Sequence, residues 1–153
     1  MIHHMSIAAK NPQHVAGVIA EFWRGQAMPF PPVAEGSWVA AACDERNTLI
    51  EVYPLGAELH PADGDADPVA VMNPQASGFT ASHAAIASPL EQAEVFAIAA
   101  REGWTAKYRK RGGQFGVIEL WIENTTMIEV LTPEMQREYL ALTPRVAVSR
   151  PTA

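Results

Sequence analysis

Apolar positions along the chain follow two patterns, short strand-like runs and two longer amphipathic stretches. Runs such as "IHHMSIA" and "TLIEVYP" alternate or are almost continuously apolar, which is typical of β-strands. The stretches that follow Pro12 and Pro89 instead repeat apolar residues at helical spacing. The pattern predicts two helices there, and it predicts strands at 2–8, 37–43, 48–54, 80–87, 105–111, 115–122 and 126–132.

Both amphipathic stretches carry signals for where a helix begins and ends. Asn-Pro at 11–12 and Ser-Pro at 88–89 each supply a capping side chain followed by a proline at the first helical position. Glu91, three residues after the serine, completes a capping-box pattern, and Gly25 and Gly103 are suited to end the helices. We expect one buried stripe on each helix, made of Val15, Val18, Ile19, Phe22 and Trp23 in the first and Ala93, Phe96, Ala97 and Ala100 in the second.

The second half of the chain repeats the first. A shift of 78 positions places Val39, Glu45, Thr48, Ile50, Glu51 and Val52 on Val117, Glu123, Thr126, Ile128, Glu129 and Val130. Upstream, a shift of 79 positions places His4, Ile7 and Ala8 on His83, Ile86 and Ala87. The sequence therefore predicts a duplicated unit of roughly 50 residues.

Each unit contains a strand, a helix and up to three strands, which predicts an α+β fold. We expect two tandem β-α-β-β-β modules, at 1–54 and 79–132, that form a concave, barrel-like mixed sheet with the helices outside. The first module's equivalent of the 105–111 strand would fall near "MPFPPVA", where the prolines weaken the prediction.

The remaining segments connect and follow the modules. Residues 55–78 are rich in Pro, Gly, Asp and Ala and are too long for an ordinary connection, so they are either a linker or a functional lid, with a short strand at "VAVM". Residues 133–153 are expected to form a C-terminal helix and tail.

Strand alternation predicts which side chains face the cavity. If Ile50, Val52, Ile128 and Val130 pack on the helices, the glutamates between them must face the other way. These glutamates are Glu51 and Glu129. The same alternation gives His4 to the cavity face and leaves His3 packed or at an edge, and the repeat makes His83 the equivalent of His4.

Charge and cysteine content exclude several classes of protein. Seventeen acidic against eleven basic residues give a net charge of −6, which argues against a nucleic acid or an anionic membrane as the partner. The single cysteine, Cys43, rules out an intramolecular disulfide framework and favours a reducing compartment. No segment has the roughly 20 continuous apolar residues of a membrane helix, so we expect a soluble, cytoplasmic protein.

The repeat offers one His-Glu pair in each module, His4 with Glu51 and His83 with Glu129. Two carboxylates that converge on a semi-enclosed cavity repel each other unless a cation lies between them. Two carboxylates and two neutral imidazoles balance the charge of a divalent ion, and mixed nitrogen and oxygen ligands suit Zn, Ni, Co, Mn or Fe(II). Four such ligands leave positions open on an octahedral ion, as in a catalytic site. The alternative is four ordinary residues, strand-edge glutamates and hydrogen-bonded histidines.

Other residues have two interpretations each. Glu119 is either a third carboxylate for proton transfer, on the strand beside Glu129, or a solvated strand-edge residue. The basic run "KYRKRGG", which includes Arg109, either holds an anionic group or is a solvated hairpin end. Tyr53 and Trp121 either line an apolar pocket or belong to the core, and Cys43 is expected to serve in packing.

These modules, opened by "HHMSI" and "SHAAI" and each closed by "IEV", resemble the vicinal oxygen chelate superfamily. That superfamily includes glyoxalase I, methylmalonyl-CoA epimerase, extradiol dioxygenases, and the fosfomycin- and bleomycin-resistance proteins. The resemblance covers the chain to about residue 132 and implies a paired-module fold, a homodimer, and metal ligands at His4, Glu51, His83 and Glu129. The His/Glu/His/Glu set is most similar to the glyoxalase and epimerase branches. The turn before the last strand, "IENT", departs from the Asp-Pro-Asp-Gly type of many members, and no residues match a glutathione site.

The resemblance and the residues together favour a divalent-metal-dependent lyase, isomerase or epimerase. Such an enzyme would move a proton on a small substrate that is chelated through two oxygens. Glu129 or Glu51 would carry the proton, with Glu119 as a third candidate, and the substrate would contact Tyr53, Trp121 and Arg109. Two alternatives remain, a metal-free ligand-sequestering protein similar to bleomycin-resistance proteins, and an extradiol-type dioxygenase with Fe(II) or Mn(II). Whether the site forms within one chain or across a dimer is open.

Overall fold

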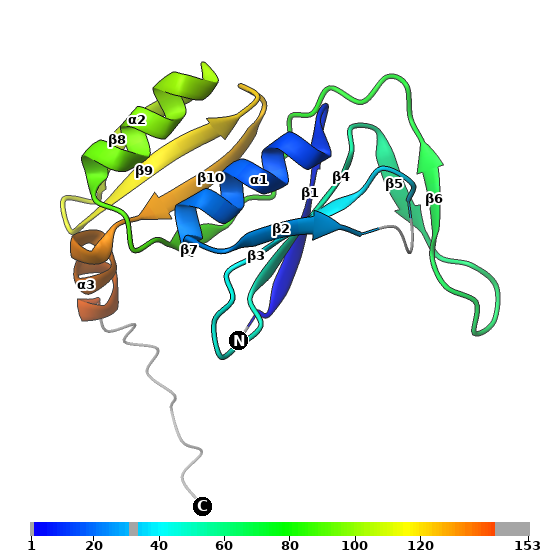
Figure 1. The fold of residues 1–153 in the computed structure, drawn as a ribbon, viewed down its shortest axis with the longest axis horizontal. Coiled ribbons are helices and arrows are strands. Elements are labelled where there is room, and N and C mark those ends of the chain that lie inside the picture. Colours follow the sequence, from blue (N-terminus) through cyan, green and yellow to red (C-terminus); the bar gives the residue numbers. More distant parts are fainter. Residues whose placement is uncertain (1, 31–33, 143–153) are drawn as a thin grey trace, which may run out of the picture.

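The computed structural model describes residues 2–30 and 34–142, which form an α+β fold with two four-stranded sheets (Figure 1). The first module consists of β1 (His4–Ala9), α1 (Pro12–Trp23), β2 (Gln26–Pro29), β3 (Trp38–Ala41) and β4 (Leu49–Pro54). The second consists of β7 (Ala85–Ala87), α2 (Gln92–Glu102), β8 (Thr105–Arg111), β9 (Phe115–Ile122) and β10 (Thr126–Leu131). The strand orders are β1-β4-β3-β2 and β7-β10-β9-β8, and in each sheet the first pair is parallel and the others antiparallel. The predicted β-α-β-β-β duplication is therefore confirmed, although the sheets within the described residues do not close into a barrel.

A strand does form close to the stretch where prolines weakened the prediction. It is β2, at the edge of the first sheet. It pairs with β3 alone, and Pro29 is its last residue. An edge strand tolerates proline because its outer side has no partner strand that needs an N–H donor. Residues 31–33 of the expected strand lie outside the described part of the chain.

The ladder register corrects one part of the repeat alignment. Val39 lies opposite Glu51, but the residue opposite Glu129 is Glu119 and not Val117. The predicted match of Val39 with Val117 is therefore wrong by two residues, because the connection between the last two strands is shorter in the second module. The correction places an acidic residue beside Glu129 where the first module has valine.

Helix α1 begins and ends close to the predicted positions. The Asn11 side chain accepts a hydrogen bond from the backbone N–H of His14, as an N-cap does. The left-handed residue that ends the helix is Arg24 (φ 54°), one position before Gly25. Gly25 is required for a different reason, since a Cβ there would lie 2.0 Å from the carbonyl oxygen of Ala41.

Helix α2 begins at Gln92, later than the Ser-Pro pattern predicts. Glu91 is its N-cap and forms the capping box with Glu94. Ser88 is engaged elsewhere, because its buried hydroxyl donates to the carbonyl oxygen of Phe22 near the end of α1. A carbonyl at a helix end lacks an intrahelical donor, so this bond joins the modules instead of capping α2.

The buried face of α2 also differs from the predicted one. The stripe predicted for α1 is confirmed, since all five of its residues are buried. In α2 the buried residues are Val95, Ile98 and Ala99, whereas the predicted Ala93, Ala97 and Ala100 are exposed and Phe96 is half-buried. Burying the larger Val95 and Ile98 side chains removes more apolar area from water than burying alanines, which decides the orientation of the helix.

The sheets bury the faces that strand alternation predicts. Ile50, Val52, Ile128 and Val130 are each at most 1% exposed and belong to one apolar core with the inner face of α1. Glu51 and Glu129, which lie between these pairs of residues, face the other side of their sheets and are partly exposed. Both modules contribute to this single core.

The segment between the modules contains a two-stranded sheet at the far side of the first module (Figure 1). Strand β6 (Val69–Met72) coincides with the predicted "VAVM" strand, and it pairs with β5 (Ala57–His60), which the sequence pattern did not indicate. Four large apolar side chains of this hairpin are about half exposed, namely Leu59, Val69, Val71 and Met72.

A third helix, α3 (Pro133–Ala141), follows β10 and packs against β9 and β10. The rest of the expected tail, 143–153, lies outside the described residues. Among the residues that are described, no helix is both long enough and apolar enough to cross a membrane.

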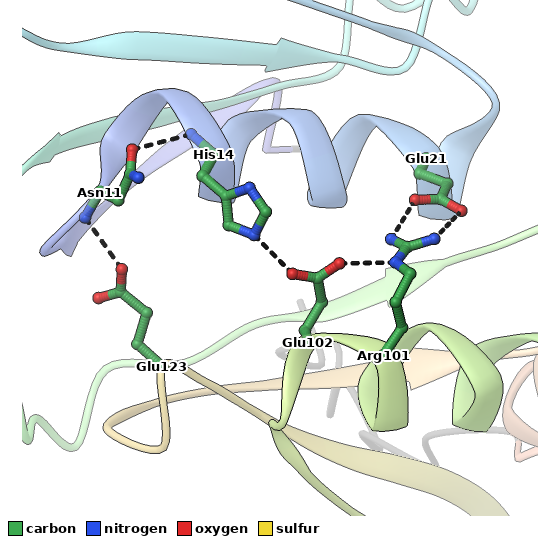
Figure 2. A network of polar contacts seen from close by, with 6 residues as sticks. All are labelled: Asn11, His14, Glu21, Arg101, Glu102 and Glu123. Carbon is green, nitrogen blue, oxygen red and sulfur yellow. Dashed lines mark hydrogen bonds and ion pairs between the residues drawn. The ribbon is translucent and has the colours of Figure 1, made fainter.

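Polar contacts join α1 to the second module (Figure 2). Arg101 donates two hydrogen bonds, of 3.0 and 2.6 Å, to the carboxylate of Glu21, while Glu102 contacts both Arg101 and the ring of His14. The Glu123 carboxylate accepts from two backbone N–H groups at the start of α1. Together with the shared core, these contacts hold the two modules in one arrangement.

Candidate functional site

The first predicted His-Glu pair meets on one face of the first sheet. His4 Nε2 lies 3.9 Å from Glu51 Oε1. The parallel ladder places Ser6 opposite Glu51, so His4 and Ser6 project from β1 on the same side as the carboxylate. The His4 side chain is 57% exposed and that of Glu51 is 13% exposed, which leaves the imidazole accessible beside a largely covered carboxylate.

Two hydroxyl groups hold the Glu51 carboxylate in place. Ser6 Oγ donates to Glu51 Oε2 at 2.7 Å, and the Tyr53 hydroxyl donates to the same oxygen at 3.3 Å. Burial, and then the neighbouring Glu51 charge, raise the pKa of Tyr53, so the phenol stays protonated and remains a donor at neutral pH. Because both hydroxyls act on Oε2, Oε1 is the oxygen presented to His4. Sequence patterns gave no role to Ser6, although alternation put it on this face.

The second predicted glutamate has different partners. Arg111 donates from Nε, at 3.2 Å, and from Nη2 to Glu129 Oε1, and Nη2 also donates to Glu119 at 2.9 Å. Arg109 lies 3.5 Å from the other oxygen of Glu119. The hydrogen bond to Glu129, and more weakly the one to Glu119, raise the pKa of Arg111, which stays charged. Glu119 is thus largely covered and contacts two guanidinium groups, whereas the Arg109 side chain is also 46% exposed to solvent.

His83 precedes β7 instead of lying within it. Ala85 is opposite Glu129 in the parallel ladder, so His83 occupies the register position that His4 has in the first sheet. Its Nδ1 lies 3.1 Å from the carbonyl oxygen of Ala81, and the residue is exposed. His83 and His4 both line a cavity of about 250 Å³ between the starts of β1 and β7.

The donor set of one chain fits half of a divalent metal site. His4 and Glu51 offer the mixed nitrogen and oxygen ligands that such ions accept, and hydroxyl groups orient the carboxylate from outside. Glu129 is already balanced by the Arg111 guanidinium. Within 2–30 and 34–142, no group of three or more His, Cys, Asp or Glu side chains is arranged to hold a metal ion. In the second half of the predicted set, Arg111 holds Oε1 of Glu129, so Oε2 is the oxygen left to contact an ion.

The other predicted residues separate into two groups. Tyr53 lines a larger cavity next to Glu51, although it is only 5% exposed overall. Trp121 is half-buried on β9 opposite Met127 and lines neither cavity. Cys43 is exposed in a left-handed turn conformation (φ 56°), so its expected packing role is wrong. The turn after β3 carries it away from the core.

Sequence comparison identifies no relative for this chain. No family model matches it, and no curated protein matches it. The evidence on its family is therefore structural.

Several solved structures share the fold. Lactoylglutathione lyase from Agrobacterium tumefaciens superposes with a TM-score of 0.55 at 9% identity, over 88% of this chain and 94% of that one. The fosfomycin resistance protein FosX from Mesorhizobium loti gives 0.54 at 8% identity, over 91% and 97%. The trypanothione-dependent glyoxalase I from Leishmania major gives 0.50 at 15% identity, over 92% of each chain. At these identities the likeness shows the fold alone, and it is the paired-module fold that the resemblance to the vicinal oxygen chelate superfamily implied.

Proposed function

We propose that this protein is a divalent-metal-dependent, glyoxalase-like lyase, isomerase or epimerase that works as a homodimer. His4 and Glu51 of one protomer would hold the metal together with His83 and Glu129 of the other. The observation that carries the proposal is the equivalent register of the two His-Glu pairs, each histidine lying two residues before the partner of its glutamate in a parallel ladder. The hydroxyl support of Glu51 is a second argument, since such outer contacts commonly orient metal ligands.

When bound, the metal would stabilise negative charge on the substrate oxygens. The residues of the chain would supply the proton transfer. Ser6 and Tyr53 occupy Oε2 of Glu51, so Oε1 is left to accept a proton or to contact the ion. Glu129 and Glu119 are both hydrogen-bonded to Arg111, which makes Glu51 the best placed of the three carboxylates to act as a base.

Metal content tests the proposal directly. Protein purified without chelators should contain about one divalent ion per chain. His83→Ala should weaken metal affinity by more than the roughly tenfold to hundredfold that is typical of losing an outer contact, so the purified variant should hold little metal. His60→Ala is the matched control, because His60 is an exposed histidine on β5. Full occupancy of the His83→Ala variant would reject His83 as a ligand. Iron together with oxygen uptake would instead indicate dioxygenase chemistry.

Mixing two variants tests whether the site is shared between chains. A mixed dimer of His4→Ala and His83→Ala has one site with both lesions and one site with none, if each site combines the two chains. Metal binding should then reappear after the variants are unfolded and refolded together. No recovery in verified mixed dimers would mean that each site belongs to a single chain.

A metal-free binding protein is the second candidate, and the Arg111 contacts favour it. A guanidinium between Glu119 and Glu129 supplies the positive charge that a metal ion would otherwise supply. In that case the wild-type protein would hold no stoichiometric metal, and His83→Ala would change nothing in its metal content. The protein would then sequester a small molecule without converting it.

A further inference from the structure

A second cavity lies beside Glu51, and none of the four predicted metal ligands lines it. It measures about 430 Å³ and is bounded by β1, the end of β4, β5 and the segment 73–82 that leads to β7. Leu55, Leu59 and Phe79 provide apolar wall. Because β5 and residues 73–78 belong to the segment between the modules, this cavity combines that segment with residues of both modules.

The hydroxyl groups nearest the sheet use their protons within the protein. Ser6 and Tyr53 both donate to Glu51. A hydroxyl has one proton to donate and two lone pairs that accept. Once the proton is engaged, each of these groups offers a ligand in the cavity only an acceptor.

Two threonines on the opposite side behave in the same way. Thr80 Oγ1 donates to the carbonyl oxygen of Ser82 at 3.0 Å, and Thr126 Oγ1 lies 3.4 Å from the carbonyl oxygens of Ala8 and Gly78. Four hydroxyl groups of the lining are therefore acceptors. Ser77 and Ser82 carry the other two hydroxyl groups of the lining, so acceptor hydroxyls outnumber possible donor hydroxyls by four to two, which favours a ligand that brings donors.

The charge of the cavity also favours a ligand that brings donors. Glu58 is the charged residue of the lining, and no Lys, Arg or His lines the cavity within the described part of the chain. The side-chain hydrogen bond from Asn73, and then that from His60, lower the pKa of Glu58, so it is ionised at neutral pH. The chain as a whole is acidic, which adds a general attraction for cations.

We propose that this cavity binds an organic amine with a small apolar body. The ammonium group would donate to Glu58 and to the hydroxyl oxygens, while the carbon skeleton contacts Leu55, Leu59 and Phe79. An ammonium has three donors and no acceptor, which matches a lining with four acceptor hydroxyls and a fixed negative charge. A carboxylate or phosphate ligand would be repelled by Glu58, and no Lys, Arg or His of the described lining would pair its charge. The inference concerns binding, and it holds whether or not the chain binds metal.

Three probes that differ only in the polar group test the proposal. 2-Phenylethylamine, 2-phenylethanol and phenylacetate are titrated into the full-length protein in the presence of a chelator, with calorimetry for affinity and backbone NMR shifts for location. The amine should bind at least about tenfold more tightly than the alcohol, a difference of 1.4 kcal/mol. Phenylacetate should not bind, and the shifts should centre on Ser6, Gly56 and Gly78. Tighter binding of phenylacetate, or shifts elsewhere, would overturn the proposal.

Two variants separate charge from shape. Glu58→Gln keeps the size of the side chain and should remove the preference for the amine over the alcohol, while Glu45→Gln, an exposed acid after β3, should leave it unchanged. Ala76→Trp fills the cavity from its half-buried wall and should abolish binding of both the amine and the alcohol. An amine that binds Ala76→Trp as well as wild type occupies another site, and that result would reject the assignment.

Discussion

The two modules carry the same His-Glu pair in the same ladder register, but they surround it differently. In the first, neutral hydroxyl donors hold Glu51, and its free oxygen faces His4. In the second, the Arg111 guanidinium holds Glu129, and His83 lies before the strand. Duplication has preserved the backbone positions of the pair and changed its electrostatics.

Three positions account for the difference. Ser6 corresponds to Ala85 and Tyr53 to Leu131, so the second module has lost both hydroxyl donors. Opposite its glutamate it has gained Glu119, which replaces a valine. A second carboxylate beside Glu129 needs a positive charge between them, and Arg111 provides it.

Under the proposed function, this contrast would give the two halves different roles in metal binding. Glu51 is held by neutral hydroxyl groups, so it could accept an ion without weakening a contact with Lys or Arg among the described residues. An ion at Glu129 would compete with the Arg111 guanidinium for the charge of the carboxylate, so binding there would be weaker. We expect the first half to bind first and the second half to complete the site.

Replacing Arg111 should have the largest effect on this contrast. Arg111→Met leaves Glu119 and Glu129, whose side chains are only 15% and 13% exposed, without a donor, and it should lower the free energy of unfolding by about 2 kcal/mol without metal. Zn²⁺ or Ni²⁺ should then bind at least about tenfold more tightly than to wild type, because the competing cation is gone. Thermal unfolding with and without metal measures both effects.

Arg109→Met is the matched control for this variant. Arg109 contacts Glu119 at 3.5 Å and makes no hydrogen bond to Glu129 among the described residues, so metal affinity should stay within about twofold of wild type. If metal protects Arg111→Met from unfolding no better than it protects wild type, Glu129 is not a ligand and the metal-free interpretation gains support.

Removing the hydroxyl donors of the first half should have the next largest effect. Tyr53→Phe and Ser6→Ala each take one hydrogen bond from Glu51 Oε2, and each should weaken metal binding by about tenfold, as is usual for an outer contact of a ligand. Competition with a chromogenic chelator measures the change. Tyr108→Phe, at an exposed tyrosine of β8, should leave the affinity unaltered. Equal affinity of all three variants and wild type would mean that Glu51 binds no metal.

The sequence was sufficient for the features that depend on periodicity. Alternation at Ile50 and Val52 and their repeat at Ile128 and Val130 predicts the buried faces of both sheets, and hence the side on which Glu51 lies. These features are local, because the direction of a strand side chain follows from its position in the pleat.

Features that depend on which distant group a side chain reaches could not be predicted in this way. Ser88 resembles a helix cap in sequence, yet it binds the carbonyl of Phe22, which lies 66 positions away. Arg111 is one of several basic residues in a run, and only the sheet order, with β9 between β8 and β10, brings it to Glu129. The predicted metal set had the correct register, but the charge that Arg111 adds is a tertiary property.

The contrast between the halves also requires that the two modules keep a fixed arrangement. Weakening the polar contacts that join α1 to α2 should have the smallest effect on stability. Arg101→Met removes the bonds to Glu21 and Glu102 and should lower the urea midpoint at pH 7 only slightly, because Arg101 and Glu21 are 52% and 45% exposed and solvent screens their attraction. The hydrogen bond from Arg101 lowers the pKa of Glu21. Burial would raise the pKa of Glu102, but hydrogen bonds from Arg101 and His14 lower it on balance.

Carboxyls whose pKa is lowered by folding add stability above their ordinary value of 4.5, and this stability is lost as the pH falls through the lower folded-state pKa. The difference between wild type and Arg101→Met in urea unfolding should therefore shrink between pH 5 and pH 3, as the carboxylates are protonated. Arg24→Met is the control. Arg24 is 64% exposed and its contact with Glu94 is long, at 3.9 Å, so the substitution should change stability little at either pH. A difference for Arg101→Met that persists undiminished at pH 3 would mean that the aliphatic stem of Arg101 stabilises the arrangement of the two modules and that the carboxylates do not.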